Sequence, residues 1–418
     1  MSQSPDLLFL AHRIPYPPNK GDKIRSWNEL KLLARDHRVH LGCFVDAEAD
    51  WQHVEFLKET CGGECYFAPL DKRTATLRSV RGFLTGEALS LPYYHDRRFA
   101  AWVRDVVARH RPRAAVAFSS QMAQYLIDAP PPMIRVMDMI DVDSDKWRQY
   151  ATRKSPPMSW VFAREARCLE RFEIRVAERF DATFLVSRQE TEFFQRLAPQ
   201  AAERVRCVRN GVDTAFFAPQ PPQPGLFAAQ EFPLVFTGAM DYWPNIDAAL
   251  WFAREILPAV RTRVAGAVFY IVGSNPTPEL RAVARAGEIV VTGTVPDTRP
   301  YIAGAGAVVA PLRIARGVQN KVLEAMAMAK PVVTTTKALQ GIDAVAGEDL
   351  LIADEPYGFA AAIEGIKHSG AHEIAARARA CVMRNYGWES NLSYLLDLVA
   401  GTGPATSTRT QQTGTGRP

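Results

Sequence analysis

Short apolar runs alternate with helical patterns along most of the chain. The first run, Leu7–Ala11, leads into a loop rich in proline and glycine. Ile24, Trp27, Leu30 and Ala34 follow at helical spacing, which predicts a helix. Further runs in the first half are Val39–Val45, Cys65–Leu70, Ala114–Phe118, Ile134–Met139 and Ala182–Val186. Strands that alternate with helices predict βαβ units and a parallel sheet.

The alternation stops at a proline-rich segment and then starts again. Pro219–Pro224 reads PQPPQP, a composition typical of a linker. Beyond it, strand-like runs recur at Leu234–Thr237, Ala267–Val272, Ile289–Val291, Ala307–Leu312, Val332–Thr336 and Leu350–Ile352. We therefore expect two α/β domains, 1–215 and 225–381, and a disordered tail over 401–418. In open sheets of this kind, ligand sites lie at the carboxyl ends of strands.

Composition is that of an ordinary globular protein, with 47% apolar and 23% charged residues. The longest charge-free stretches, Thr214–Gln230 and Val264–Pro278, are shorter than the ~20 apolar residues of a membrane helix. Prolines interrupt both. The first residues show no signal-peptide pattern, and the six cysteines show no zinc-site spacing. We therefore expect a cytoplasmic chain with reduced cysteines and no membrane span.

Positive charge is concentrated in the first half of the chain. Residues 1–215 carry 33 Lys/Arg and 28 Asp/Glu, whereas the remaining residues carry 17 of each. A basic first half suits an acidic membrane surface or a phosphorylated acceptor. An ordinary soluble surface explains the same numbers equally well.

The segment Arg313–Pro331, RIARGVQNKVLEAMAMAKP, carries the most specific chemistry. It follows a predicted strand and opens a helix near Val318, where free backbone N–H groups favour an anion and Gly317 allows close approach. Lys321 and Glu324 share one side of that helix. A lysine for a diphosphate and a carboxylate for ribose hydroxyls suit a nucleotide sugar. The alternative is a solvated ion pair on an ordinary helix.

The loop after the first strand is a second candidate site. His12 follows the strand, and Gly21 lies at the start of the next helix. Lys20, Lys23 and Arg25 bring three cations to a helix start whose dipole already favours anions. A glycine turn with exposed lysines is the alternative.

Two amphipathic stretches complete the pattern. Trp160–Phe180 alternates charged and apolar residues, and a core-facing helix with a charged outer side explains it. Lys72–Phe83 mixes basic residues with Leu77 and Val80, and we hypothesise reversible membrane contact there.

Several motifs, in order along the chain, resemble glycosyltransferase family 4. Arg313–Pro331 is similar to the donor motif of that family, with Glu324 on its second glutamate and Arg316 where the first would stand. The other matching motifs are Asn210-Gly211-Val212-Asp213, Phe236-Thr237-Gly238 followed by Pro244-Asn245, Ile271-Val272-Gly273 and Thr292-Gly293-Thr294-Val295.

The pattern is closest to the sugar transferases associated with PEP-CTERM/exosortase exopolysaccharide systems. The stretches that carry this likeness are His12 to Arg25 (HRIPYPPNKGDKIR) and Asp138 to Trp147 (DMIDVDSDKW). The resemblance implies a GT-B fold, two Rossmann-like domains facing across a cleft, with a terminal helix at about 382–400 crossing back to the first domain. It also implies a bacterial, retaining transferase that acts on a glycan or lipid-linked acceptor, with a UDP- or GDP-sugar as donor and no nucleic-acid partner.

Site residues follow from the resemblance and from the residues together. Donor-binding candidates are Gly238, Gly273, Val295, Gly317, Val318, Gln319, Asn320, Lys321 and Glu324. Catalytic candidates are His12, Arg316 and Lys321. Acceptor-side candidates are Asn19, Gly21, Lys23, Arg25 and Asp141, the last with loop capping as its alternative.

No cofactor and no metal are expected. Asp141 and Asp143 imitate a metal-binding DxD motif, but the resembled enzymes balance the diphosphate with helix dipoles and basic side chains. The chain departs from the family pattern at Arg316 and in Ala117-Phe118-Ser119-Ser120, where many members carry a histidine. A degenerate binding protein of the same fold therefore stays an alternative, as does a nucleotide-sugar epimerase.

Overall fold

A computed structural model describes residues 4–152, 154–315 and 318–402. The chain forms two compact units. Unit 1 runs to Arg209 and resumes at Leu392, and unit 2 is Asn210–Asn391. Within the described ranges, no helix is long and apolar enough to cross a membrane.

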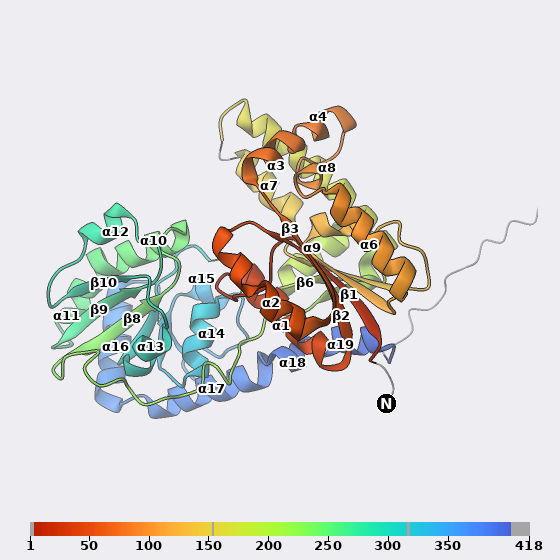
Figure 1. Ribbon diagram of the computed structural model, residues 1–418. Coiled ribbons are helices and arrows are strands. Elements are labelled where there is room, and N and C mark those ends of the chain that lie inside the picture. The colour runs from red at the N-terminus through yellow and green to blue at the C-terminus, as the bar shows by residue number, and fades with distance from the viewer. Residues whose placement is uncertain (1–3, 153, 316–317, 403–418) are drawn as a thin grey trace, which may run out of the picture. The chain divides into compact units, whose positions relative to one another are not determined.

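In the described part of unit 1, seven parallel strands form one sheet in the order β3-β2-β1-β4-β5-β6-β7 (Figure 1). The strands are β1 (Asp6–Ala11), β2 (Arg38–Val45), β3 (Gly62–Pro69), β4 (Ala114–Phe118), β5 (Ile134–Ile140), β6 (Ala182–Leu185) and β7 (Val205–Cys207). The helices are α1 (Gly21–Asp36), α2 (Val54–Cys61), α3 (Lys72–Ser79), α4 (Arg81–Thr85), α5 (Ser90–Tyr93), α6 (Arg97–His110), α7 (Asp143–Thr152), α8 (Met158–Arg179), α9 (Arg188–Leu197) and α19 (Ser393–Ala400), with 3-10 turns η1 (Glu48–His53), η2 (Ser120–Tyr125) and η3 (Pro199–Arg204).

The core of unit 1 explains why its strands are apolar on both sides. Leu8 and Leu10 of β1 pack in one cluster with Phe99 of α6 and Leu169 of α8. The alternate β1 residues, such as Phe9, are fully buried as well. A parallel sheet covered on both faces needs such continuous apolar strands.

Helix α1 buries charge as well as apolar surface. Its Arg25 has no exposed surface and donates two hydrogen bonds to Asp138 of β5 (2.8 and 2.6 Å) and one to the carbonyl of Val208 (2.8 Å). Glu29 is also fully buried, and burial raises its pKa well above the ordinary value. The apolar residues at helical spacing form only part of the buried side of α1, because Ile24 and Trp27 stay half-buried.

In unit 2, the described residues contribute a six-stranded parallel sheet in the order β10-β9-β8-β11-β12-β13. The strands are β8 (Phe232–Thr237), β9 (Ala267–Val272), β10 (Ile289–Gly293), β11 (Ala307–Ala310), β12 (Val332–Thr334) and β13 (Leu351–Ile352). The helices are α10 (Trp243–Trp251), η4 (Phe252–Ile256), α11 (Leu257–Arg261), α12 (Pro278–Ala282), α13 (Arg299–Gly304), α14 (Asn320–Ala327), α15 (Thr336–Leu339), α16 (Pro356–Ser369), α17 (His372–Asn385) and α18 (Trp388–Asn391).

Strand β9 shows how the two faces of this sheet are covered. Phe269 and Ile271 lie in one apolar cluster with Phe359 of α16. Tyr270, between them, lies in a second cluster with Leu323 of α14. Alternate side chains therefore face different helix layers, as the pleat of a strand requires.

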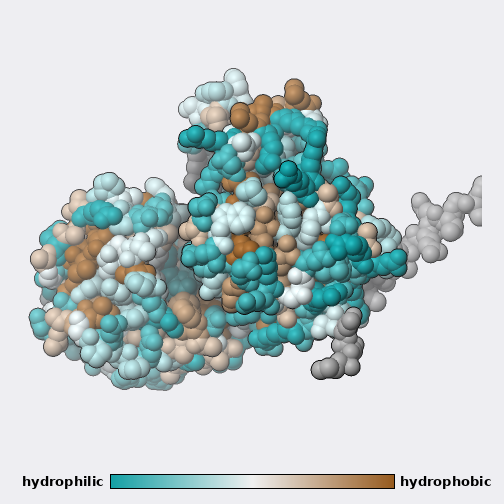
Figure 2. Space-filling model, viewed as in Figure 1, coloured by the Kyte–Doolittle hydropathy of each residue, from teal (hydrophilic) through white to brown (hydrophobic). Residues whose placement is uncertain are grey.

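The two parallel α/β sheets confirm the predicted fold class. The predicted strands are present within a few residues, and β7 is a strand that the apolar pattern missed. Trp160, at the start of the predicted amphipathic stretch Trp160–Phe180, is 69% exposed, so the core-facing side of α8 begins only after it. Figure 2 shows apolar residues gathered on the surface over α3 and α4. From residue 403 onward, the predicted tail lies outside the described residues.

Candidate functional site

The sheet of unit 2 has its topological switch between β8 and β11. From β8 the chain proceeds to β9 and β10 on one side, and from β11 to β12 and β13 on the other. The loops that follow β8 and β11 therefore diverge, and this is where open α/β sheets bind ligands. Gly238 follows β8, and the segment that leads into α14 follows β11.

Lys321 of α14 and Asn245 of α10 connect the helices that follow these two loops. The Lys321 Nζ donates a 2.5 Å hydrogen bond to Asn245 Oδ1 and lies 5.0 Å from the centre of the Phe236 ring. The Asn245 Nδ2 donates to the carbonyl of Ala239 (2.9 Å), which fixes the orientation of the amide. The lysine is thus positioned by a residue 76 positions away in sequence. Asn245 belongs to one of the motifs that carry the family resemblance, but it is not among the predicted site residues.

The surroundings of Lys321 change its acid–base behaviour and that of Glu324. Burial lowers the pKa of Lys321 to about 8 and raises the pKa of Glu324 to about 7, while the attraction between the two charges opposes both shifts. Lys321 does not form the solvated ion pair with Glu324 that the sequence left open. Its ammonium donates its hydrogen bond to Asn245 instead.

Two glycines leave room for this arrangement. A Cβ added to Gly238 would lie 2.7 Å from Asn245 Nδ2 and 3.5 Å from Lys321 Cε. A Cβ added to Gly273, after β9, would lie 1.7 Å from the carbonyl oxygen of Gly238. The ends of β8 and β9 therefore leave no room for a side chain at either position: one at Gly238 would collide with Asn245, and one at Gly273 would collide with the backbone of Gly238.

The remaining donor-side candidates lie around the start of α14 or after β10. Gln319 is the N-cap residue of α14, and Val318 precedes it. The Oδ1 of Asn320 is buried and has no hydrogen-bond partner among the described residues. Val295 packs against the apolar cluster beneath α14. Arg316 and Gly317 lie outside the described residues.

The switch point of unit 1 lies between β1 and β4, by the same reasoning. His12, directly after β1, stacks on Phe118 at the end of β4, with ring centres 6.0 Å apart. Its Nε2 lies 3.3 Å from Asp22 Oδ2, which also accepts a 2.6 Å hydrogen bond from Arg13. Burial alone would raise the pKa of the Asp22 carboxyl, but the neighbouring His12 and Arg13 side chains hold that pKa well below its ordinary value. This edge of the sheet therefore combines an imidazole, a carboxylate and a guanidinium.

The acceptor-side candidates are placed differently from one another. Asn19 and Gly21 are exposed at the start of α1. Lys23 is buried and bonded to Asp50 (2.7 Å), and Arg25 is enclosed with Asp138. In this arrangement the two cations stabilise the loop from within and present no charge to solvent.

Asp141 belongs to an ion-paired cluster after β5. Lys146 Nζ lies 2.9 Å from Asp141 and 3.2 Å from Asp143, and these carboxylates raise the pKa of Lys146 despite burial. Asp141 therefore has a structural partner in α7, whereas its carboxylate keeps partial exposure.

Backbone strain marks the same edge of the sheet. Ser119 has φ of 76° after β4, and Ile140 has φ of 68° at the end of β5. These values are unfavourable for side chains, above all for a β-branched one, and such outliers cluster at functional sites. No sequence signal indicates them, since neither position is glycine or asparagine.

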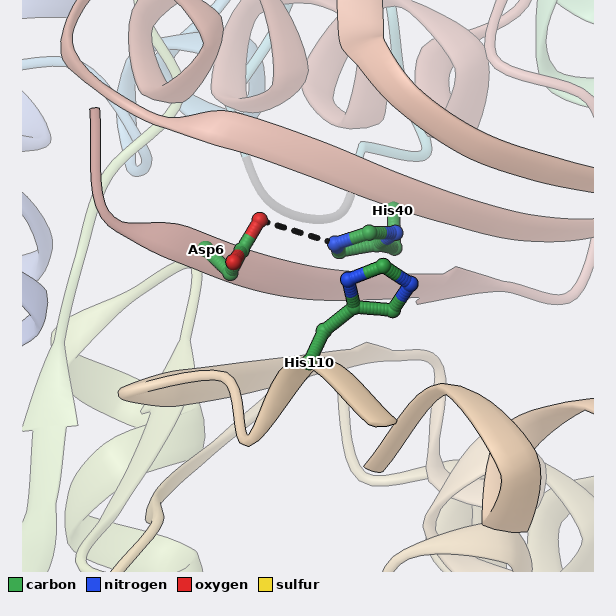
Figure 3. Close-up of side chains that lie close together, drawn as sticks. All are labelled: Asp6, His40 and His110. Carbon is green, nitrogen blue, oxygen red and sulfur yellow. Dashed lines mark hydrogen bonds and ion pairs between the residues drawn. The ribbon is translucent and has the colours of Figure 1, made fainter. Parts of the chain in front are cut away.

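Asp6, His40 and His110 gather at the opposite, amino-terminal edge of the unit 1 sheet (Figure 3). The backbone N–H of Glu64 donates to Nδ1 of His40 (3.1 Å), so the ring hydrogen of a neutral His40 lies on Nε2, which faces Asp6 at 3.0 Å. That tautomer has no free lone pair on Nε2 for a metal ion. The cluster therefore fits a hydrogen-bonded staple between strands better than a metal site.

One protein-family model matches the segment of unit 2 that contains Gly238, Asn245, Lys321 and Glu324. Residues 231–368 match the family model described as glycosyl transferases group 1. No curated protein sequence matches the chain.

Several solved structures resemble nearly the whole chain at low sequence identity. HepE from Anabaena, in complex with UDP, has a TM-score of 0.66 and 15% identity over 95% of this chain and 100% of HepE. Sucrose-phosphate synthase from Thermosynechococcus elongatus has a TM-score of 0.66 and 16% identity over 95% and 99% of the two chains. WaaG, a glycosyltransferase involved in lipopolysaccharide biosynthesis, has a TM-score of 0.61 and 14% identity over 94% and 100%. These likenesses show the fold, which is GT-B with two Rossmann-like units.

Proposed function

We propose that the chain is a retaining glycosyltransferase that moves a sugar from a nucleotide diphosphate sugar to a hydroxyl of a glycan or lipid-linked acceptor. The glycosyl transferases group 1 match over 231–368 supports a glycosyltransferase. The observation that carries the donor assignment is the Lys321–Asn245 pair, with Glu324 one turn away, at the switch point of the matched segment. A cation and a carboxylate at this spacing suit a diphosphate and a ribose, respectively.

We assign the donor to the C-terminal domain, 225–381, and the acceptor to the N-terminal domain, 1–215. HepE was crystallised with UDP-glucose as well as with UDP, which favours a UDP-sugar among the candidates. The start of α14 would hold the diphosphate through Lys321 and the backbone near Asn320, and Glu324 would hold the ribose. No metal is required in this scheme, because the lysine and the helix start supply positive charge.

The proposed reaction needs little covalent chemistry from the protein. The bond between the anomeric carbon and the diphosphate oxygen breaks, and the acceptor oxygen bonds to that carbon from the same side. The acceptor proton passes to the departing diphosphate. Lys321 stabilises the charge that develops there, while His12 and Asp141 lie at the strand ends where an acceptor would be oriented.

The biological setting is a proposal that rests on the sequence resemblance. The motifs around His12 and Asp141 favour bacterial exopolysaccharide biosynthesis in the cytoplasm, with the acceptor presented at the inner face of the membrane.

The first experiment is a screen of UDP-, GDP- and dTDP-sugars for thermal stabilisation and slow hydrolysis. We expect one donor to stabilise the protein and to be cleaved, and we expect Glu324→Ala to abolish both effects. Glu373→Ala is the matched control, because that exposed glutamate of α17 forms an ion pair with Arg377 on the same helix and with no other described residue.

Each other outcome has a definite meaning. Binding without cleavage, even with lipid-linked acceptors present, would favour a degenerate binding protein. Equal loss in the Glu324 and Glu373 variants, or no binding by any nucleotide sugar, would contradict the donor site.

A further inference from the structure

Unit 1 exposes a cluster of large apolar side chains, which we call the apolar tip. It consists of Leu77, Val80, Phe83 and Leu84 of the α3–α4 segment and Met158 and Trp160 at the start of α8. Leu84 is 89% exposed, Leu77 73% and Trp160 69%. Figure 2 shows part of this cluster as a brown area over the helices that Figure 1 labels α3 and α4.

Polar contacts hold the two segments of the tip together. The Arg164 guanidinium lies 4.8 Å from the centre of the Phe83 ring and donates a 2.6 Å hydrogen bond to the carbonyl of Gly82. The Glu165 carboxylate accepts from the backbone N–H groups of Leu89 and Ser90 (2.5 and 3.0 Å). Trp160 lies one turn before Arg164, on the same side of α8. The apolar side chains therefore stay exposed on a braced scaffold.

The charged residues within α3 and α4 are all basic. Helices α3 and α4 contain no acidic residue, and they carry Lys72, Arg73, Arg78 and Arg81. Arg81 also lines a cavity of about 360 Å³ together with Arg175 and Arg179 of α8. Glu87 and Asp128 line the same cavity, so the cavity carries charges of both signs. The exposed helices α3 and α4 beside it carry only positive charges.

We propose that the apolar tip binds the surface of an anionic lipid bilayer. Leucine, phenylalanine and tryptophan side chains would enter the headgroup boundary, and the neighbouring cations would meet lipid phosphates. This occupant fits better than a protein partner, since scattered arginines around an apolar centre suit an extended negative surface. Trp160, which the sequence pattern assigned to a core-facing helix, becomes part of the contact. The inference does not depend on the donor site in unit 2.

The test is flotation of the full chain with vesicles of phosphatidylcholine alone and of equal parts phosphatidylcholine and phosphatidylglycerol. We expect binding only to the anionic vesicles, with loss of about tenfold or more in Arg73→Glu/Arg81→Glu and in Leu84→Ser/Trp160→Ser. Arg78 is left unchanged because it donates to the carbonyl of Tyr93, so its reversal would disturb the fold. Tyr357→Ser, which removes a 75% exposed aromatic side chain from unit 2, should bind like the parent.

Circular dichroism and thermal unfolding of each variant separate a lost surface from a lost fold. The proposal is overturned if the parent does not float with anionic vesicles, or if correctly folded tip variants float as well as the parent. It is also overturned if the parent forms dimers without lipid that Leu84→Ser/Trp160→Ser dissociates, because a second copy would then be the partner. Nucleotide-sugar stabilisation, measured in parallel, reports on unit 2 and should be the same in all these variants.

Discussion

The side chain of Lys321 shows how position within the fold turns an ordinary residue into a site residue. Its ammonium is held between Asn245 and the Phe236 ring, and burial lowers its pKa to about 8. A diphosphate at this position would compete with the Asn245 carbonyl for the same protons. The free lysine therefore loses its charge near pH 8, only slightly above neutral pH.

The lowered pKa of Lys321 predicts that the affinity for UDP depends on pH. Since the free protein gives up the Lys321 proton near pH 8 and a diphosphate favours the charged form, affinity should fall as pH rises above about 8. The slope should be at most about tenfold per pH unit, with proton uptake on binding. Titration calorimetry between pH 7 and 10 in two buffers measures both quantities.

Lys321→Arg is the matched comparison for this titration. A guanidinium stays charged throughout the range, so its affinity should be flat above pH 8 even where it is weaker overall. A parent protein with the same flat profile would show that Lys321 does not contact the diphosphate.

The sequence did not predict which distant residues form hydrogen bonds with the buried charged side chains. Lys321 and Glu324 were predicted because they follow a strand and share a helix side, and both stay candidates. Asn245 is 76 positions from Lys321, and Asp138 is 113 positions from Arg25. Helical and strand periodicity indicate which residues are buried but not which distant residue satisfies a buried charge.

At the scale of elements, apolar periodicity predicted nearly all strands because parallel strands are buried on both faces. Strand β7 was missed because its three residues, Val-Arg-Cys, are too few and too polar to stand out. The exposed start of α8 was also missed. A helix pattern gives one apolar side, but it does not tell whether that side is covered along the whole length of the helix.

The strand ends of unit 2 give a test at this scale. Gly273→Ala should destabilise unit 2 by about 1–3 kcal/mol, because the new Cβ would collide with the carbonyl oxygen of Gly238 and displace Asn245 beside it. Urea unfolding measures the loss, and UDP affinity should fall with it.

Gly365→Ala provides the control for that substitution. Gly365 lies in the interior of α16 with open space at its Cβ position, so alanine there should be neutral or stabilise by about 0.5–1 kcal/mol. A Gly273 variant as stable as the Gly365 variant would mean that the strand ends are not closely packed in solution.

At the scale of the whole molecule, unit 1 is completed by residues from the far end of the chain. Leu395 and Val399 of α19 are buried, and Tyr394 contacts the Phe184 ring of β6 and the Arg206 guanidinium of β7. This helix follows unit 2 in sequence, whereas packing assigns it to unit 1. The family resemblance implies such a return at about 382–400, and the described return begins at Leu392.

Leu395→Ala should therefore destabilise unit 1 and leave unit 2 intact. Loss of a buried leucine costs about 2–5 kcal/mol. Hydrogen exchange read by mass spectrometry should show lower protection in β6 and β7 and unchanged protection in β8 and β9. Asp397→Ala, on the exposed side of the same helix, should change neither. Equal loss of protection in both units would contradict this division.

The return of the chain to unit 1 also has a consequence for synthesis on the ribosome. The sheet of unit 1 is translated before residue 210, but α19 follows only after all of unit 2, Asn210–Asn391. At about 5–20 residues per second, the nascent sheet waits on the order of 10–40 s for its last helix. During that interval β6 and β7 lack the cover of Tyr394 and Leu395, so chaperone binding to nascent chains should peak while unit 2 is being made.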